Sequence, residues 1–173
     1  MKRLGIALLA LPVTLALLLP ATARAAGGPH SAGKFGAGLV VGYPGVGLSF
    51  NYFMTSKMSL QIDPTFYFRD NSRHGGGGEG GIGSRLDLLY WPSTLVSWPF
   101  ANLDWLIGPG LNIYVGNGGF ALGAEVPLGI SLAFKGAPVD VSLELVPVLR
   151  LVDSGGADIR LGLGAALSAR YYF

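Results

Sequence analysis

Cysteine is absent from this 173-residue chain, and charged residues make up only 13% of it. Without a thiol the chain forms no disulfide, no thiolate metal site and no cysteine nucleophile, and it carries no lipid on a cysteine. Histidine is almost as scarce, because the chain holds only His30 and His74. Two histidines without ligand spacing predict no metal site, and we expect no cofactor.

Long apolar runs are also missing beyond residue 25. Half of the residues are apolar, yet no later run approaches the ~18 apolar residues that indicate a transmembrane helix. No long stretch has helical spacing, and glycine is abundant, with 28 residues. An apolar composition without a spanning helix is typical of strands that alternate between lipid-facing and interior positions.

Residues 1–25 have the three regions of a secretory signal peptide. Lys2 and Arg3 precede an apolar run over residues 4–19, and Ala23 and Ala25 stand at the two positions that a signal peptidase reads. This pattern predicts cleavage after residue 25. The alternative is a membrane-anchor helix, but the run contains a proline and is shorter than the ~20 residues that such a helix needs.

Removal of the signal peptide would change the charge balance of the chain. It takes away three of the 12 basic residues and leaves nine against ten acidic ones, so the net charge moves from +2 to −1. No basic patch interleaved with aromatic residues remains, and we expect no nucleic-acid partner. We expect residues 26–33 to be a flexible N-terminal segment and residues 34–173 to form one domain.

Period-two alternation of apolar and polar residues dominates the mature chain and predicts eight strands. Turn signals such as Pro44-Gly45 and the glycine-rich residues 116–119 separate them. The glycine-rich segment 69–83 is the longest connection, and we expect it to be a mobile external loop available to an extracellular partner. The predicted strands are 34–43, 46–53, 58–68, 84–91, 103–115, 120–134, 139–151 and 158–173.

This pattern predicts an all-β fold, an eight-stranded antiparallel up-and-down transmembrane β-barrel. Tilted strands of about ten residues are long enough to cross a bilayer, and closure pairs the backbone groups that lipid would leave unsatisfied. Aromatic residues gather at the strand ends, as in the girdles at membrane interfaces. The predicted girdle on the periplasmic side includes Tyr52, Tyr90, Trp91, Trp98, Trp105 and Phe134.

The charged residues of the predicted strands fall on the face opposite the aliphatic one. A charge on the lipid face near the midplane costs ~2–4 kcal/mol, so we expect these residues to line the lumen: Arg85, Asp87, Glu125, Asp140, Glu144, Arg150, Arg160 and Arg170. A last hairpin folded about residue 155 places Asp140 opposite Arg170. It also places Arg150 opposite Arg160, with Glu125 between those two arginines. Two interpretations are a structural plug of paired charges and a narrow selective pore.

The C-terminal residues carry a family resemblance. Leu167, Ala169, Tyr171 and Phe173, spaced by two, resemble the C-terminal assembly signal of outer-membrane barrels. The mature chain resembles the small eight-stranded class typified by the OmpA membrane domain and OmpX. The resemblance implies a place in the cell outer membrane, contact with its lipids and insertion by the barrel assembly machinery. The tight turn at Pro44 departs from the long loop that this class often has there.

Three functions remain open at this point: a structural or surface-interaction barrel, a narrow porin-like channel, and a lipid-modifying enzyme. A Ser/His/acid set needs groups held within hydrogen-bond reach. His30 lies in the predicted flexible start, and His74 lies near Ser72 and Glu79 in the glycine-rich loop. That loop is a poor support for catalysis, so the sequence predicts no catalytic residues and no enzyme.

Overall fold

The structure is a computed structural model that describes residues 28–69, 79–116, 119–153 and 156–173. The predicted signal peptide, residues 1–25, lies outside the described residues. Every regular element in the described part of the chain is a β-strand. Within these same ranges, no helix is long and apolar enough to cross a membrane.

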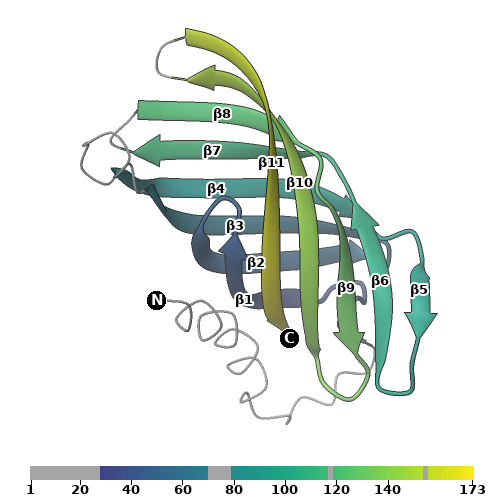
Figure 1. The fold of residues 1–173 in the computed structure, drawn as a ribbon. Coiled ribbons are helices and arrows are strands. Elements are labelled where there is room, and N and C mark those ends of the chain that lie inside the picture. Colours follow the sequence, from purple (N-terminus) through teal and green to yellow (C-terminus); the bar gives the residue numbers. More distant parts are fainter. Residues whose placement is uncertain (1–27, 70–78, 117–118, 154–155) are drawn as a thin grey trace, which may run out of the picture.

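Eight of the strands form a hydrogen-bonded antiparallel ring (Figure 1). The strands in chain order are β1 (Phe35–Gly42), β2 (Val46–Thr55), β3 (Met58–Arg69), β4 (Glu79–Tyr90), β5 (Thr94–Ser97), β6 (Ala101–Ile107), β7 (Gly110–Gly116), β8 (Gly119–Glu125), β9 (Leu128–Phe134), β10 (Val139–Asp153) and β11 (Gly156–Tyr172). The ring runs β1, β2, β3, β4, β7, β8, β10, β11, and β11 pairs with both β10 and β1. The prediction of an all-β antiparallel fold is therefore confirmed.

Two of the predicted strands were wrong in extent. Segments 103–115 and 120–134 were expected to be continuous, but each is divided into two strands, β6 and β7, and β8 and β9. Pro109 and Pro127 stand at the breaks, and a proline without an N–H cannot continue a strand ladder. Figure 1 shows β6 and β9 running steeply away from β7 and β8. The short strand β5, predicted as a connection, pairs with the edge of β6.

The predicted long loop was also too long. Residues 79–83 belong to β4, which pairs with β3 as far as Glu79 opposite Arg69. Residues 70–78, which include His74, lie outside the described part, so the predicted contact with an extracellular partner has no structural account. The hairpin signal at 116–119 was correct, because β7 and β8 pair up to Gly116 opposite Gly119.

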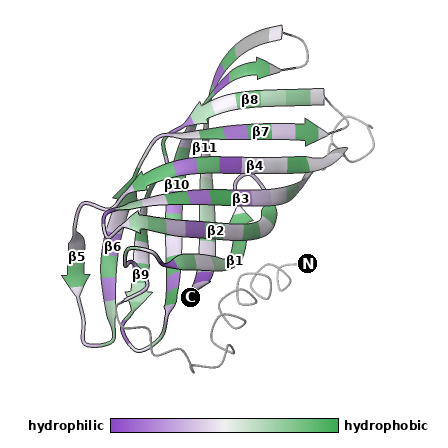
Figure 2. Ribbon diagram, turned by 180° about the vertical axis from the view of Figure 1, so that it is seen from behind, coloured by the Kyte–Doolittle hydropathy of each residue, from purple (hydrophilic) through white to green (hydrophobic). Residues whose placement is uncertain are grey.

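The ring has a polar interior and an apolar exterior. Residues alternate along each strand, and Figure 2 shows the resulting bands of hydrophilic and hydrophobic residues. In β3, Gln61, Asp63 and Thr65 are buried, whereas the neighbouring Leu60 and Ile62 are exposed. Pleated strands put neighbouring side chains on opposite faces, so the same alternation around the ring gathers the polar groups inside it.

One end of the interior is apolar and closes the polar region. Five buried side chains form a cluster there: Phe53, Leu89, Trp91, Leu106 and Tyr172. Two hydrogen bonds connect their polar atoms to the strands, since the Trp91 indole N–H donates to the Ser59 hydroxyl at 2.9 Å and the Tyr172 hydroxyl donates to Asp140 at 2.9 Å. The N-terminal residues 28–33 pack against this end.

Candidate functional site

Arg85 is the centre of a buried charge network inside the ring. It projects inward from β4 and has no exposed side-chain surface. Its Nε donates to Glu125 at 2.8 Å. Its Nη2 donates to Asp87 at 2.8 Å and to Glu144 at 2.7 Å. Nη1 lies 3.6 Å from Asp63, so one guanidinium is shared among four carboxylates from β3, β4, β8 and β10.

A second arginine, Arg170 of β11, extends the network toward the apolar end. Its Nε and Nη2 donate to the two carboxylate oxygens of Asp140, each at 3.0 Å. Nη1 donates to the side-chain carbonyl of Gln61, whose amide in turn donates to Glu144 at 3.2 Å. The fork of a guanidinium matches a carboxylate in this bidentate geometry. Gln61 therefore connects the Arg170 and Arg85 parts of the network.

Carboxylates outnumber arginines in this interior. The fully buried charged residues of the described ranges are Asp63, Asp87, Glu125, Asp140 and Glu144 against Arg85 and Arg170. One oxygen of Asp63 and one of Asp87 are buried without a hydrogen-bond partner. Buried charges are stable only when paired or neutralised. The excess of buried carboxylates over arginines therefore makes the interior unfavourable for a further anion.

His30 caps the network from the N-terminal segment. Its Nδ1 lies 2.8 Å from Oδ2 of Asp104, and its Nε2 lies 3.0 Å from Oδ2 of Asp140. The ring also stacks on Phe53 at a centroid distance of 4.9 Å and contacts Trp91 at 4.3 Å. Burial by itself lowers the pKa of His30, but the hydrogen bonds and charges of the two aspartates outweigh it and raise the pKa above its ordinary 6.5.

This arrangement corrects the prediction of a flexible start for the described residues 28–33. The N–H of Gly33 donates to the carbonyl of Phe53 at 2.8 Å, and the Ser31 hydroxyl donates to the carbonyl of Gly28 at 2.8 Å. Pro29 is buried. The imidazole binds two aspartates from β6 and β10, and those contacts hold the segment across the end of the ring.

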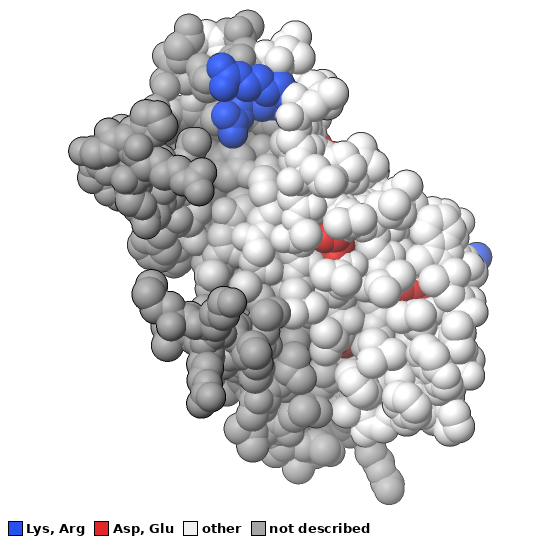
Figure 3. Space-filling model, in the orientation of Figure 1, with Lys and Arg blue, Asp and Glu red and all other residues white. Residues whose placement is uncertain are grey.

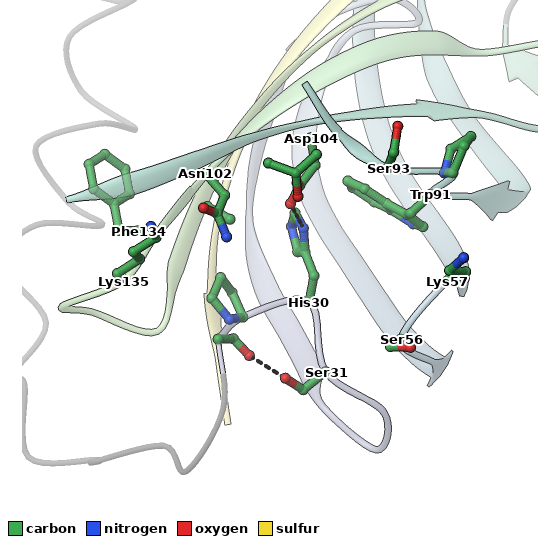
Figure 4. A pocket seen from close by; sticks show the side chains of 15 residues that line it. His30, Ser31, Ser56, Lys57, Trp91, Ser93, Asn102, Asp104, Phe134 and Lys135 are labelled. Carbon is green, nitrogen blue, oxygen red and sulfur yellow. Dashed lines mark hydrogen bonds and ion pairs between the residues drawn. The ribbon is translucent and has the colours of Figure 1, made fainter. Parts of the chain in front are cut away.

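An open cavity of about 320 Å³ adjoins this cap. Figure 4 shows His30 pointing toward Asp104, with Trp91 beside it and Lys57 and Lys135 on the rim. The Lys135 ammonium donates to the Ser97 hydroxyl at 2.8 Å and to the carbonyl of Trp98 at 2.6 Å. Both ring nitrogens of His30 face carboxylates, so neither is left to activate a nucleophile.

The structure brings together six of the eight residues predicted for the lumen. Arg85, Asp87, Glu125, Asp140, Glu144 and Arg170 lie in the buried network described above. The predicted hairpin register is confirmed, since Asp140 is opposite Arg170 and Arg150 is opposite Arg160. The predicted position of Glu125 between Arg150 and Arg160 was wrong. Its carboxylate instead accepts from Arg85 and from the Asn112 amide at 2.6 Å, because β8 pairs with β7, which holds Asn112 beside it.

The predicted aromatic girdle needs one correction. Trp91 is only 4% exposed and packs inside the ring against His30 and Phe53. The odd-numbered residues Leu89 and Trp91 continue the inward face of β4, whereas Tyr90 points outward. Of the other predicted members, Tyr52, Tyr90 and Trp98 are exposed and Trp105 and Phe134 are half-buried.

The C-terminal residues pair as a closing strand requires. Tyr171 lies opposite Ala37 of β1 and Val139 of β10. The centroid of its ring lies 5.0 Å from that of Phe173. The role of Leu167, Ala169, Tyr171 and Phe173 as an assembly signal stays a prediction.

Some site residues escaped the sequence analysis. Gln61 and Asp63 stand on the polar face of a strongly alternating strand, and that pattern was a usable signal. Asp104 and Tyr172 also stand on the polar faces of alternating segments, but their partners in the network lie more than 30 positions away in the chain. His30 gave no such signal, because it precedes the first strand and its contacts join segments that are distant in the sequence. No group of three or more His, Asp or Glu side chains in the described ranges is arranged to hold a metal ion.

Comparison of the chain with protein-family models, with curated proteins and with solved structures gave no match.

Proposed function

We propose that this chain is an integral β-barrel protein of the outer membrane of a Gram-negative-type cell, with a structural or surface-interaction role. One observation carries the proposal: the burial pattern is the reverse of that of a water-soluble protein. The sheet buries sixteen polar or charged residues of the described ranges, from Ser49 to Arg170, and exposes large apolar side chains on nearly every strand. Isolated exposed apolar residues are ordinary, but an apolar surface of this extent indicates a membrane or a partner.

The strand arrangement supports the same proposal. Lipid offers no hydrogen bonds to backbone groups, so only helices and closed sheets cross a bilayer. The pairing of β11 with both β10 and β1 closes the ring and meets that requirement, except along the part of β11 that extends beyond β1. The signal peptide predicted at residues 1–25 and the C-terminal pattern ending at Phe173 supply the export route and the assembly signal of this proposal.

The interior network supports a plugged barrel. Arg85 and Arg170 reach across the interior and bond to carboxylates of β3, β4, β8 and β10. Small barrels of about eight strands are filled by side chains. His30 and the aromatic cluster close one end.

A narrow cation-conducting channel is the second candidate. The excess of buried carboxylates over arginines favours it, because an acidic lining attracts cations and repels anions. The geometry gives no comparable support to a lipid-modifying enzyme. The two nitrogens of His30 are engaged by Asp104 and Asp140, and His74 lies outside the described residues.

Cell fractionation and gel mobility test the proposal directly. The protein should sediment with the outer membrane, should lack residues 1–25, and should migrate differently on a denaturing gel before and after boiling. A boiled sample of the same preparation is the control. Recovery in the water-soluble fraction with identical mobility before and after boiling would overturn the proposal.

A further inference from the structure

The pairing of β1 with β11 closes the ring, but the upper part of β11 extends beyond the end of β1. The β1–β11 pairing runs from Gly36 opposite Tyr172 to Gly42 opposite Ala166. One more bond follows, from the Tyr43 N–H to the carbonyl of Ala165 at 2.7 Å. Beyond it, β11 continues to Gly156 with β10 as its only strand neighbour in the described ranges. The short turn between β1 and β2 ends the ring on that side.

Apolar side chains mark this part of β11. Ile159, Leu161 and Leu163 are 75%, 86% and 73% exposed, more than any other large apolar residue described. They lie on the outer face of the strand, where an apolar side chain is favourable in lipid and unfavourable in water. In the proposed barrel the edge of β11 therefore lies beside lipid, and no strand of the described ranges pairs with its backbone groups on that side.

A cavity of about 230 Å³ opens at this edge. Leu161, Gly162 and Leu163 of β11 line it together with Arg160. The exposed side chains of Leu161 and Leu163 therefore stand directly beside the cavity. A Cβ added at Gly162 would meet no atom within 4 Å, whereas one added at Gly164 would lie 2.3 Å from the Tyr43 ring. Gly162 is therefore the open floor, and the ring of Tyr43 bounds the lower side.

Tyr43 reaches this position because of Gly42. Strict alternation would place the Tyr43 side chain on the outer face with Val41. The φ angle of Gly42 is +121°, a conformation that residues with a Cβ rarely adopt. The turn at Gly42 directs Tyr43 inward, where the centroid of its ring lies 6.1 Å from that of Tyr114.

The remaining wall is basic. Arg150 and Arg160 line the cavity and are direct cross-strand partners on the inner face of β10 and β11. Figure 3 shows the largest basic area of this side of the molecule near the upper ends of these strands. Both arginines are exposed, so a ligand in the cavity can reach their side chains. Guanidinium groups bind phosphates and carboxylates through paired hydrogen bonds.

We infer that this lateral cavity binds an amphiphile with a phosphate or carboxylate headgroup. The headgroup lies between Arg150, Arg160 and Tyr43, and the acyl chain leaves over the β11 edge along Leu161 and Leu163. The cavity of about 230 Å³ has room for only a few groups the size of a water molecule, which occupies about 30 Å³ in the liquid. This volume suits a headgroup and not a whole lipid. An anionic headgroup is not expected deeper inside the ring, because buried carboxylates outnumber arginines there. This inference rests on the proposed membrane location and adds a ligand class to it.

Binding of dodecyl phosphate to the folded, signal-free protein in a neutral detergent tests the inference. We expect dodecyl phosphate to bind in preference to dodecyl maltoside, with inorganic phosphate at least about tenfold weaker because it lacks the chain. Arg150→Gln should weaken binding about tenfold, because it removes the charge-assisted hydrogen bond between the guanidinium and the headgroup, and a factor of ten corresponds to ~1.4 kcal/mol. Gly162→Phe should weaken it by filling the cavity. Lys34→Gln, which removes a positive charge away from the cavity, is the matched control.

Each result has a distinct meaning. Equal affinity for dodecyl phosphate and dodecyl maltoside, or wild-type affinity in both Arg150→Gln and Gly162→Phe, would overturn the inference. Inorganic phosphate binding as tightly as dodecyl phosphate would overturn the amphiphile and leave a simple anion site. A dimer that disappears when the β11 edge is altered would assign the edge to a second copy instead. The boiling-dependent gel shift is measured on the same samples, so a shift without binding refutes only this inference, and absence of the shift refutes the barrel.

Discussion

His30 and Asp140 are 110 positions apart in the chain, and their side chains meet with Nε2 3.0 Å from Oδ2. Asp140 is also the main partner of Arg170 and accepts from Tyr172. The second nitrogen of His30 bonds to Asp104 of β6. One imidazole thus ties the N-terminal segment to the ring and to the end of the buried network.

This contact should make docking of the N-terminal segment depend on pH. The pKa of His30 is raised in the folded protein by Asp104 and Asp140, so its charged form stabilises docking. That contribution is fully present below about pH 6.5, the pKa of a free histidine, and is lost as the pH rises through the raised pKa. Proteolysis after Lys34 should therefore be slower at pH 5.5 than at pH 9. The difference should vanish in His30→Gln, and a difference that persists in this variant would contradict the assignment.

Removal of Arg85 should destabilise the protein strongly. In Arg85→Gln, four buried carboxylates would lose their shared cation, and breaking a buried ion pair from one side costs about 3–5 kcal/mol. Denaturant unfolding followed by gel mobility measures the loss. Adding Glu144→Gln should recover part of the stability, because it removes one of the stranded charges. Equal stability of wild type and Arg85→Gln would be incompatible with the network.

A charge placed on the outer face separates a membrane protein from a soluble one. Ile62 of β3 is 40% exposed and lies opposite Phe50 and Leu86. In a bilayer, Ile62→Arg should cost ~2–4 kcal/mol, whereas on a water-exposed surface such a change is usually within about 0.5 kcal/mol. Folding yield into lipid vesicles measures the effect. Thr55→Arg, at the exposed end of β2, is the control and should fold normally.

Ion conduction tests the balance of charge in the interior. Any current through the wild-type protein in a planar bilayer should be small and carried by cations, because Asp87, Glu125 and Glu144 surround Arg85. The reversal potential in a KCl gradient reports the selectivity. Glu144→Gln should reduce the preference for cations. A preference for anions in the wild type would contradict the geometry of the network.

Alternation along the chain was enough to predict much of this architecture. Because the pleat places neighbours on opposite faces, residues such as Arg85, Asp87 and Glu144 could be assigned to the interior without knowing the fold. The register of the last hairpin, with Asp140 opposite Arg170, also followed from a local turn. These are short-range properties, and the sequence carries them directly.

Other features depend on which distant strands become neighbours. The sequence signalled the polar face that holds Glu125, but only the pairing of β8 with β7 turned its carboxylate toward Arg85 and Asn112. Beyond the breaks at Pro109 and Pro127, β9 pairs with β10 and β6 pairs with β9. This pairing places Asp104 of β6 close to Asp140 and His30. The alternation of β11 determined its outward-facing and inward-facing residues. The open edge beside Arg150 and Arg160 arose only because β1 stops at Gly42 while β11 continues, a mismatch in length between strands at opposite ends of the chain.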